Sequence, residues 1–195
     1  MSLILTGNSS TLTVDSTNGI TFPNSTIQYS AGVVLQVVQT VKTDSMASTA
    51  SAVWSDVPGQ GGSGTFSASI TPKSTTNKIL IIVDMKGAGY TDASIMRSRL
   101  LRNGTAIYVG DASSNRPQSM GQFYIAGGGG GYYIAQLGGT FLDSPATTSA
   151  VTYKMQFGAD GTTQTVYINR TQGDRDAANY DSRVPASITL MEVAG

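Results

Sequence analysis

Three aspartates near the C-terminus are the first candidates for acid–base chemistry in this sequence. Asp174, Asp176 and Asp181 lie within TQGDRDAANYDSRVP, residues 171–185. Two carboxylates on either side of a sugar linkage could hydrolyse it, one as the acid and the other as base or nucleophile. That reaction needs an apolar pocket to raise the pKa of the acid, whereas these aspartates alternate with arginine, glycine and asparagine. We therefore predict an open, solvated loop without catalytic residues.

The same aspartates could offer oxygen ligands to calcium, but their spacing does not match the EF-hand loop. The chain contains no histidine and no cysteine. Their absence from the sequence removes the commonest general base, Ser-His-Asp arrangements, thiolate nucleophiles and cysteine-based zinc sites. We expect no enzymatic activity, no metal site and no cofactor.

Tyrosines beside a run of glycines form a second candidate site, for binding rather than catalysis. Tyr124 precedes the run Gly127–Gly131, and Tyr132 and Tyr133 follow it. The run does not match a phosphate-binding loop, because no Lys-Ser or Lys-Thr follows it and the next residues predict a strand. Amphipathic aromatic side chains suit the recognition of a sugar or a protein.

The candidate receptor-binding residues are these three tyrosines together with Asp176 and Tyr180 from the charged loop. An alternative stays open, in which the tyrosines pack at a subunit interface or at the edge of the core. Trp54 is the only tryptophan, and its valine-rich surroundings favour the core or an interface over a ligand-stacking role.

The charge balance limits the possible partners. Lys+Arg and Asp+Glu both number 12, and charged residues make up 12% of the chain. Such a chain has no field to draw it to nucleic acid or to an anionic membrane. No apolar stretch of about 18 residues could span a membrane, and MSLILTGNSS lacks the features of a signal peptide. We expect no nucleic-acid binding, no membrane insertion, and synthesis in a cytosol before assembly.

The first 31 residues carry a weak repeat of apolar pairs at alternate positions, separated by turn-forming strings such as TGNSST and DSTNG. The pairs are Leu3 and Leu5, Leu12 and Val14, Ile20 and Phe22, and Ile27 and Tyr29. Strands this short are marginal alone, whereas stacking on copies of themselves in a three-chain β-shaft would give them a core. A loosely ordered arm laid on another protein is the alternative. Either way, residues 1–31 are predicted to serve assembly or attachment.

Residues 32–195 predict one globular head. VTYKMQF places Val151, Tyr153, Met155 and Phe157 on one face of a strand, and KILIIVDM contains five consecutive apolar residues, 79–83. Such an uninterrupted run predicts a strand that is covered on both faces. The glycine- and hydroxyl-rich composition disfavours helices. We predict an all-β head of about eight to ten strands, an antiparallel β-sandwich or jelly roll.

Asn103-Gly104 predicts a hairpin, because both residues tolerate the positive φ angles of a type I′ turn. The resulting register pairs Leu100 with Ile107 on one face. It also places Arg99 opposite Tyr108 on the other face, close enough for a cation–π contact.

Several segments, taken in order, resemble a module found at the ends of phage tail-fibre and related virion proteins. They are NGITFPNSTIQYSAG, VLQVVQTVKTD, SITPKSTTNKILIIVDM, RLLRNGTAIYVGDA, SPATTSAVTYKMQF, TVYINR and SITLMEV. The resemblance runs from Gly19 to the end of the chain. It implies a trimeric, β-rich structural protein on the particle surface, often involved in host attachment, and it implies no catalytic residues.

The leading hypothesis is a homotrimeric tail or collar fibre of a bacteriophage, made in the host cytoplasm and displayed on the virion. Its N-terminal arm would bind other virion proteins, and its head would contact a host surface glycan or protein. Two alternatives stay open: a trimeric capsid decoration (cement) or head-fibre protein, and a lectin-like carbohydrate-binding module. Only about thirty residues precede the module, too few for a long fibre shaft of repeated strands, so its place on the particle stays open.

Overall fold

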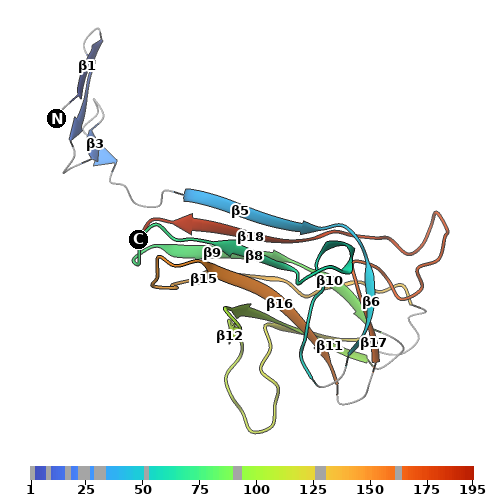
Figure 1. Cartoon of the computed structure of the whole chain (residues 1–195). Helices are drawn as coiled ribbons and strands as arrows, with labels where there is room; N and C mark the ends of the chain where they lie inside the picture. The colour runs from blue at the N-terminus through green and yellow to red at the C-terminus, as the bar shows by residue number, and fades with distance from the viewer. Residues whose placement is uncertain are drawn as a thin grey trace.

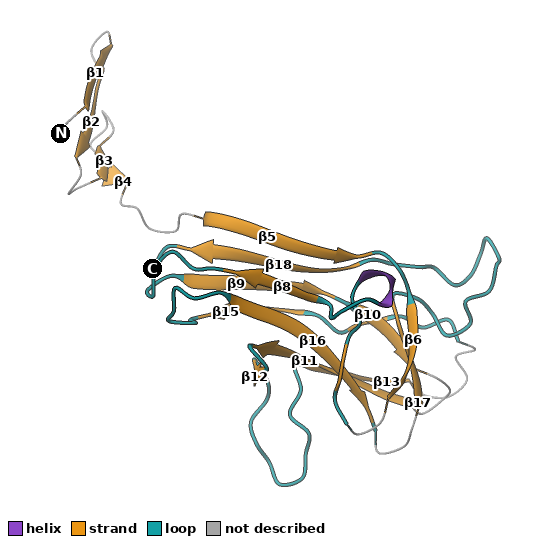
Figure 2. Ribbon diagram, in the orientation of Figure 1, coloured by secondary structure: helices purple, strands orange, loops and turns teal. Residues whose placement is uncertain are grey.

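The computed structural model of the chain describes residues 3–7, 10–15, 19–21, 27–28, 34–50, 53–89, 94–125, 131–160 and 164–195 (Figures 1 and 2). These residues form β-strands, joined by loops and by one short 3-10 helix, η1 (Gln60–Gly62). The predicted all-β class is confirmed. No helix within the described residues is long and apolar enough to cross a membrane.

The N-terminal segment forms a small antiparallel sheet of its own. Its strands pair in the order β1-β2-β3-β4; they are β1 (Leu3–Gly7), β2 (Ser10–Asp15), β3 (Gly19–Thr21) and β4 (Ile27–Gln28). The register sets predicted apolar residues opposite one another, with Leu3 paired to Val14 and Leu5 to Leu12. Phe22 and Tyr29 lie outside the described residues, as does the proposed boundary at 31–32.

The first layer of the head is a bent four-stranded sheet. Its first half has the order β15-β9-β18-β5 and its second half the order β14-β10-β17-β6, so the same four neighbours continue across the bend. At the bend, Leu137 N donates to Met85 O over 2.8 Å. The strands are β5 (Val34–Lys42), β6 (Met46–Ala50), β9 (Lys78–Asp84), β10 (Lys86–Gly89), β14 (Ala135–Gln136), β15 (Gly139–Asp143), β17 (Gln164–Ile168) and β18 (Ala186–Val193).

The second layer is a six-stranded sheet with the path β12-β11-β16-β7; β13 pairs with β11, and β8 pairs with β16. All its pairings are antiparallel. The strands are β7 (Ser55–Asp56), β8 (Ser67–Ile70), β11 (Ser94–Arg102), β12 (Thr105–Ile107), β13 (Gly121–Ile125) and β16 (Val151–Ala159).

The hydrophobic core lies between these two layers, as in a sandwich. Every second residue of β16 points into it, and Val151, Tyr153, Met155 and Phe157 are buried as predicted. The first layer contributes Ile79, Ile81, Val83, Ile188 and Leu190. The described head contains fourteen strands, β5 to β18, more than the eight to ten expected from pattern counting. The bend explains part of the excess, because it divides one run of chain into β9 and β10.

The hairpin between β11 and β12 confirms one half of its prediction and corrects the other. Asn103 and Gly104 have φ angles of 47° and 89°, and Leu100 is the register partner of Ile107. The expected contact between Arg99 and Tyr108 is wrong. Strand β12 ends at Ile107 because Tyr108 has a φ of 51°, which turns the chain out of the ladder.

These two side chains find other partners. The Tyr108 ring stacks on Phe141 with 4.8 Å between ring centroids. The Arg99 guanidinium lies 4.5 Å from the ring centroid of Trp54. Trp54 is half-buried, at the margin of the second layer, where its ring packs against Gly158.

Candidate functional site

The charged loop at residues 169–185 joins β17 to β18, and its two ends are held together at the base. Val184 N donates to Asn169 O over 3.0 Å, and Arg170 and Arg183 form an isolated β-bridge. The buried Asn169 side chain donates to the backbone oxygens of Lys42 and Asp44, at 3.0 and 3.1 Å. The loop is thereby fastened to the end of β5, beside the bend of the first layer.

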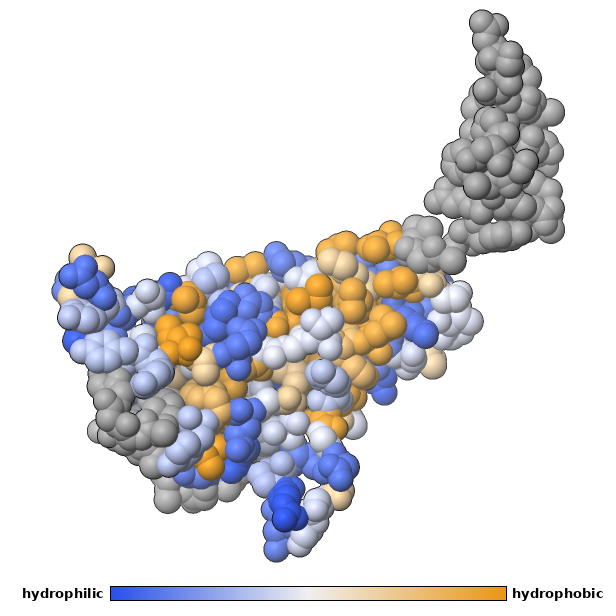
Figure 3. All heavy atoms as spheres, turned by 180° about the vertical axis from the view of Figure 1, so that it is seen from behind, coloured by the Kyte–Doolittle hydropathy of each residue, from blue (hydrophilic) through white to orange (hydrophobic). Residues whose placement is uncertain are grey.

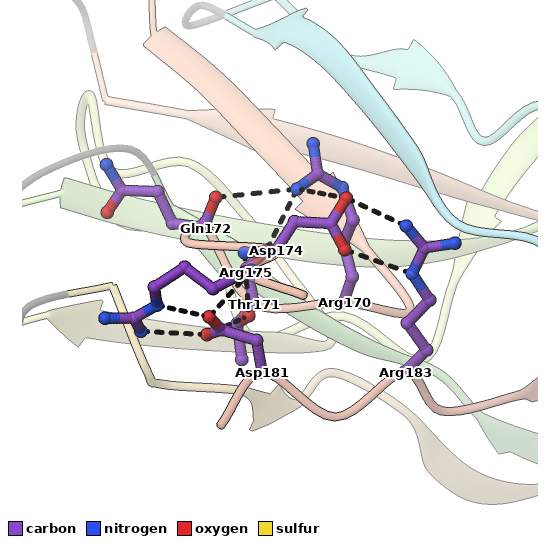
Figure 4. A network of polar contacts seen from close by, with 7 residues as sticks. All are labelled: Arg170, Thr171, Gln172, Asp174, Arg175, Asp181 and Arg183. Atoms are coloured by element: carbon purple, nitrogen blue, oxygen red, sulfur yellow. Dashed lines mark hydrogen bonds and ion pairs between the residues drawn. The ribbon is translucent and has the colours of Figure 1, made fainter. Parts of the chain in front are cut away.

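Two of the three aspartates in this loop are held by arginines (Figure 4). Asp174 accepts two hydrogen bonds from Arg183, at 2.9 and 3.0 Å, and lies 3.3 Å from Arg170. Asp181 accepts from the backbone and guanidinium of Arg175, at 2.8 and 3.0 Å, and from the Thr171 hydroxyl at 2.7 Å. Residues 175–180 are exposed, as expected of a solvated loop, and the ion pairs give this loop a defined arrangement.

The ion pairs also fix the charge state of the loop. The pKa of Asp181 lies well below its usual range, because Arg175 donates hydrogen bonds to the carboxylate and Thr171 adds another. The same hydrogen bond raises the pKa of Arg175. The carboxyl side chain of Asp181 is fully covered. A glycosidase acid needs the opposite shift, so this carboxylate holds Arg175 in position instead.

The Arg175 guanidinium stacks on two tyrosine rings. It lies 3.9 Å from the ring centroid of Tyr132 and 5.2 Å from that of Tyr180. The two rings contact each other, with 5.4 Å between centroids and a tilt of 45°. About half of the surface of each tyrosine stays exposed. Planar guanidinium groups stack well on aromatic faces, so this tyrosine–arginine cluster (Tyr132, Arg175 and Tyr180) is pre-organised without a ligand.

Gly131 connects the glycine run to this loop. Gly173 N donates to Gly131 O over 3.1 Å. Gly131 has a φ of 81°, and a Cβ there would lie only 3.2 Å from Gly173 N. The backbone conformation favours glycine at this position, and a Cβ would be a tight fit against the neighbouring backbone.

Two surface hollows, of about 520 and 500 Å³, share Tyr180 in their lining. Their size falls within the common range for ligand sites. The first is lined by Tyr132, Ile134, Thr171, Asn179 and Ser182, the second by Asp174, Arg175, Asp176 and Arg183; Ala178, Tyr180 and Asp181 line both. Together they offer aromatic faces, hydroxyl and amide groups and charged groups within one loop.

The structure brings together three of the five predicted receptor-binding residues. Tyr132, Asp176 and Tyr180 line the hollows, and Tyr133 follows Tyr132 as an exposed side chain. Tyr124 is also exposed but stands on β13 in the second layer, paired with Ile95. Pattern reasoning missed Arg175, the central cation of the cluster. Its position between two aspartates in the sequence was a signal, but it does not show that the partner is Asp181.

Within the described residues, no group of three or more metal-ligating side chains lies together. Asp174 and Asp181 have separate tasks, since they bind different arginines. The arrangement is therefore chemically suited to non-covalent recognition by stacking and hydrogen bonding.

No protein-family model matches the chain, and no curated protein matches it. Among solved structures it is similar to the infectious bursal disease virus Gx strain structure (TM-score 0.41, 10% identity, 99% of this chain and 44% of that chain). It is also similar to the T13 viral particle of that virus (TM-score 0.41, 10% identity, 94% and 46%), and to a mutant of its VP2 protein in derived T=1 particles (TM-score 0.39, 10% identity, 98% and 47%). The chain spans less than half the length of these solved chains, and at these scores the similarity transfers neither a residue role nor a function.

Proposed function

We propose that this chain is a structural protein of a virus particle, a homotrimer displayed on the particle surface. We divide the chain into an arm, residues 1–31, and a head, residues 32–195, and the observation that supports this division is the pairing of the N-terminal strands. Strands β1 to β4 pair with one another, and the described residues show no ladder between them and the head sheets. Strands of two to six residues are marginal alone and gain a core by stacking on identical copies or on another virion protein.

The sequence resemblance to phage fibre modules supports the same function. It favours a tail or collar fibre; a capsid decoration or head-fibre protein would use the same trimeric, arm-anchored design. Imaging of purified particles separates these places, because a decoration protein covers the capsid faces in many copies and a fibre occupies a few sites at the tail or the vertices.

The experiment for the proposal compares the full chain with a chain that lacks residues 1–31. We expect the truncated head to keep its β-sheet circular dichroism and to be lost from particles, because within the described residues the arm strands pair only with one another and termini outside a core are dispensable for folding. An unfolded truncated chain would place the arm within the core. Normal incorporation of the truncated head would refute the attachment role.

For the head, we propose that the tyrosine–arginine cluster and the two hollows contact the host receptor, a surface glycan or protein. The support is the exposed pair of tyrosine rings beside the polar groups of the same loop. A glycan array and binding to host cells test it, with Tyr180→Ala and with Tyr108→Ala as the control. Tyr108 is similarly exposed but stacks on Phe141. Equal losses from both variants would remove the loop from recognition.

A further inference from the structure

The outer face of the first layer carries an apolar row that runs from one sheet edge to the other. The register aligns four residues of four neighbouring strands, Val37, Met191, Leu80 and Leu142. The next outward-facing row consists of Gln39, Thr189, Ile82 and Thr140. We call these two rows, with Val34 and Val41 on β5, the apolar face.

Much of this surface is open in the isolated chain. Val34, Val37, Val41 and Leu142 have exposed fractions between 45% and 56%. Figure 3, which views the molecule from the side opposite to Figure 1, shows hydrophobic side chains gathered in a broad patch on the head. Contiguous apolar patches are uncommon on soluble monomers and mark interaction sites.

Strand β9 shows most directly that the apolar face lacks its cover. Its apolar run predicts burial on both faces, and the second layer covers Ile79, Ile81 and Val83 on the inner one. Leu80 and Ile82 point to the opposite face, where they are only half-buried. Antiparallel sheets with one wet face alternate apolar and polar residues, and β9 does not. Among the described residues, nothing covers this face fully.

We propose that the apolar face is a homotypic interface, covered by a second copy of this chain in the assembled protein. Its two rows contain no charged side chain, so a basic or acidic partner would find no counter-charge there. A second copy matches it in chemistry, and copies with zero net charge do not repel one another. Within the polar row, Gln39 donates to Thr189 over 2.8 Å, which lowers the cost of covering these two side chains.

Chain connectivity favours the same occupant. Only residues 29–33 separate β4 of the arm from β5 of the head, and that stretch spans at most about 20 Å even when fully extended. If arms of several copies assemble, the β5 strands of those copies are held close together, which raises their effective concentration for each other. The inference thus rests on the proposed homotrimer for its stoichiometry, while the location of the contact rests on the apolar face.

The experiment measures the mass of the full-length protein in solution by light scattering at micromolar concentration. We expect the unmodified chain, at 20.2 kDa per subunit, to scatter as a trimer of about 61 kDa. The double variant Val37→Lys/Leu142→Lys should shift toward 20.2 kDa while keeping its circular dichroism. The control is Ser69→Lys, which places a single lysine on an exposed strand position of the second layer and should leave the trimer intact.

Cysteine labelling provides a second readout, which does not require the fold to tolerate a lysine on the apolar face. The chain has no cysteine, so single variants Val37→Cys, Leu142→Cys and Ser69→Cys each carry one thiol. In the trimer, the first two should react with a maleimide at a small fraction of the rate of the third. A trimer in which all three thiols react alike would overturn the homotypic interface but leave the proposed trimer standing. A monomeric unmodified chain would overturn both.

Discussion

The two layers of the head bury their inner faces against each other, but their outer faces differ in kind. The first layer presents the apolar face. The second presents polar side chains that bond along and across its strands; these include Ser69 with Thr152, Lys154 and Gln156 with Asp56, Arg99 with Gln156, and Arg97 with Gln122. Their donor–acceptor distances run from 2.6 to 3.0 Å.

This difference indicates which of the two outer faces is exposed to solvent in the assembled protein. On the second layer, polar groups bond to one another and remain accessible to water, as expected for the solvated side of an antiparallel sheet. On the first layer, a complete row and part of the next hold valine, leucine, isoleucine and methionine, and burying these side chains away from water stabilises the protein. The comparison therefore separates a face for solvent from a face for assembly.

The largest effect is expected from a comparison of two neighbouring positions on β11, one in the core and one on the solvated face. Leu100→Ala should cost about 2 to 5 kcal/mol, because the side chain is fully buried in the core and its removal leaves a cavity. Arg99→Ala, one residue away, should cost about 1 kcal/mol or less, because its contacts lie on a hydrated surface. Urea titration of both variants at equal protein concentration measures the difference. A larger loss from Arg99→Ala would show that the outer network carries the fold.

The sequence was sufficient for the fold class and for the local pairings. Alternation in VTYKMQF identified the buried side of β16, and Asn103-Gly104 fixed the register of its hairpin, because both signals depend on neighbouring residues alone. The partner of Arg99 could not be predicted, since Trp54 approaches it from a distant part of the chain. The bend of the first layer was also missed, although Gly87 and Gly89 follow Met85 in the sequence and glycine within a strand pattern often marks a bend.

The candidate site shows the same limit. Asp176 and Tyr180 were identifiable in loop-like sequence, and Tyr132 as an aromatic residue beside the glycine run, yet the contact that unites the site is the tertiary stacking of Tyr132 on Arg175. Charge patterning showed that aspartates and arginines are mixed in the loop. It could not assign Asp181 to Arg175 or Asp174 to Arg183, because these pairs depend on positive φ angles at Asp174 and Asp181.

A smaller effect is expected at Glu192, the only glutamate, which is buried at the end of β18 on the inner side of the first layer. Its carboxylate accepts hydrogen bonds from Asn77, Gln36 and the backbone N of Lys73, at 2.6, 2.5 and 2.7 Å. Glu192→Gln should cost about 1 to 3 kcal/mol at pH 7, because an amide cannot accept all three. Asp84→Asn, on a half-exposed carboxylate paired with Lys86, is the control and should cost less than about 1 kcal/mol.

Acid titration sharpens this prediction. Burial opposes ionisation of Glu192, but the hydrogen bonds from Asn77, Gln36 and Lys73 outweigh it, so the pKa lies below its ordinary value. Because the pKa of Glu192 is lower in the folded state than in the unfolded state, its ionised carboxylate stabilises the fold above about pH 4.3. This stabilisation is lost as the pH falls further. The free energy of unfolding of the unmodified chain should therefore drop in acid more steeply than that of Glu192→Gln. If the free energy of unfolding of both proteins fell equally with pH, the Glu192 carboxylate would not be the cause of the loss of stability in acid.

The smallest expected effect tests the wet face by itself. Asp56 accepts hydrogen bonds from Lys154 and Gln156, each at 2.6 Å. Burial raises its pKa, but these two hydrogen bonds and the charges of Lys154 and Arg99 outweigh that and lower it. Asp56→Ala should cost about 0.2 to 1 kcal/mol, the usual range for exposed pairs. The loss should shrink in 1 M salt, where the screening length falls to about 3 Å.

Ser69→Ala provides the uncharged counterpart on the same face, since it removes only the hydrogen bond to Thr152, and its cost should not change with salt. Urea titration at low and high salt measures both variants, and light scattering follows their assembly. Neither variant should alter the mass in solution, because both lie on the layer opposite to the apolar face. If Asp56→Ala instead dissociated the protein, the polar network would belong to a subunit contact, and the division between a face for solvent and a face for assembly would fail.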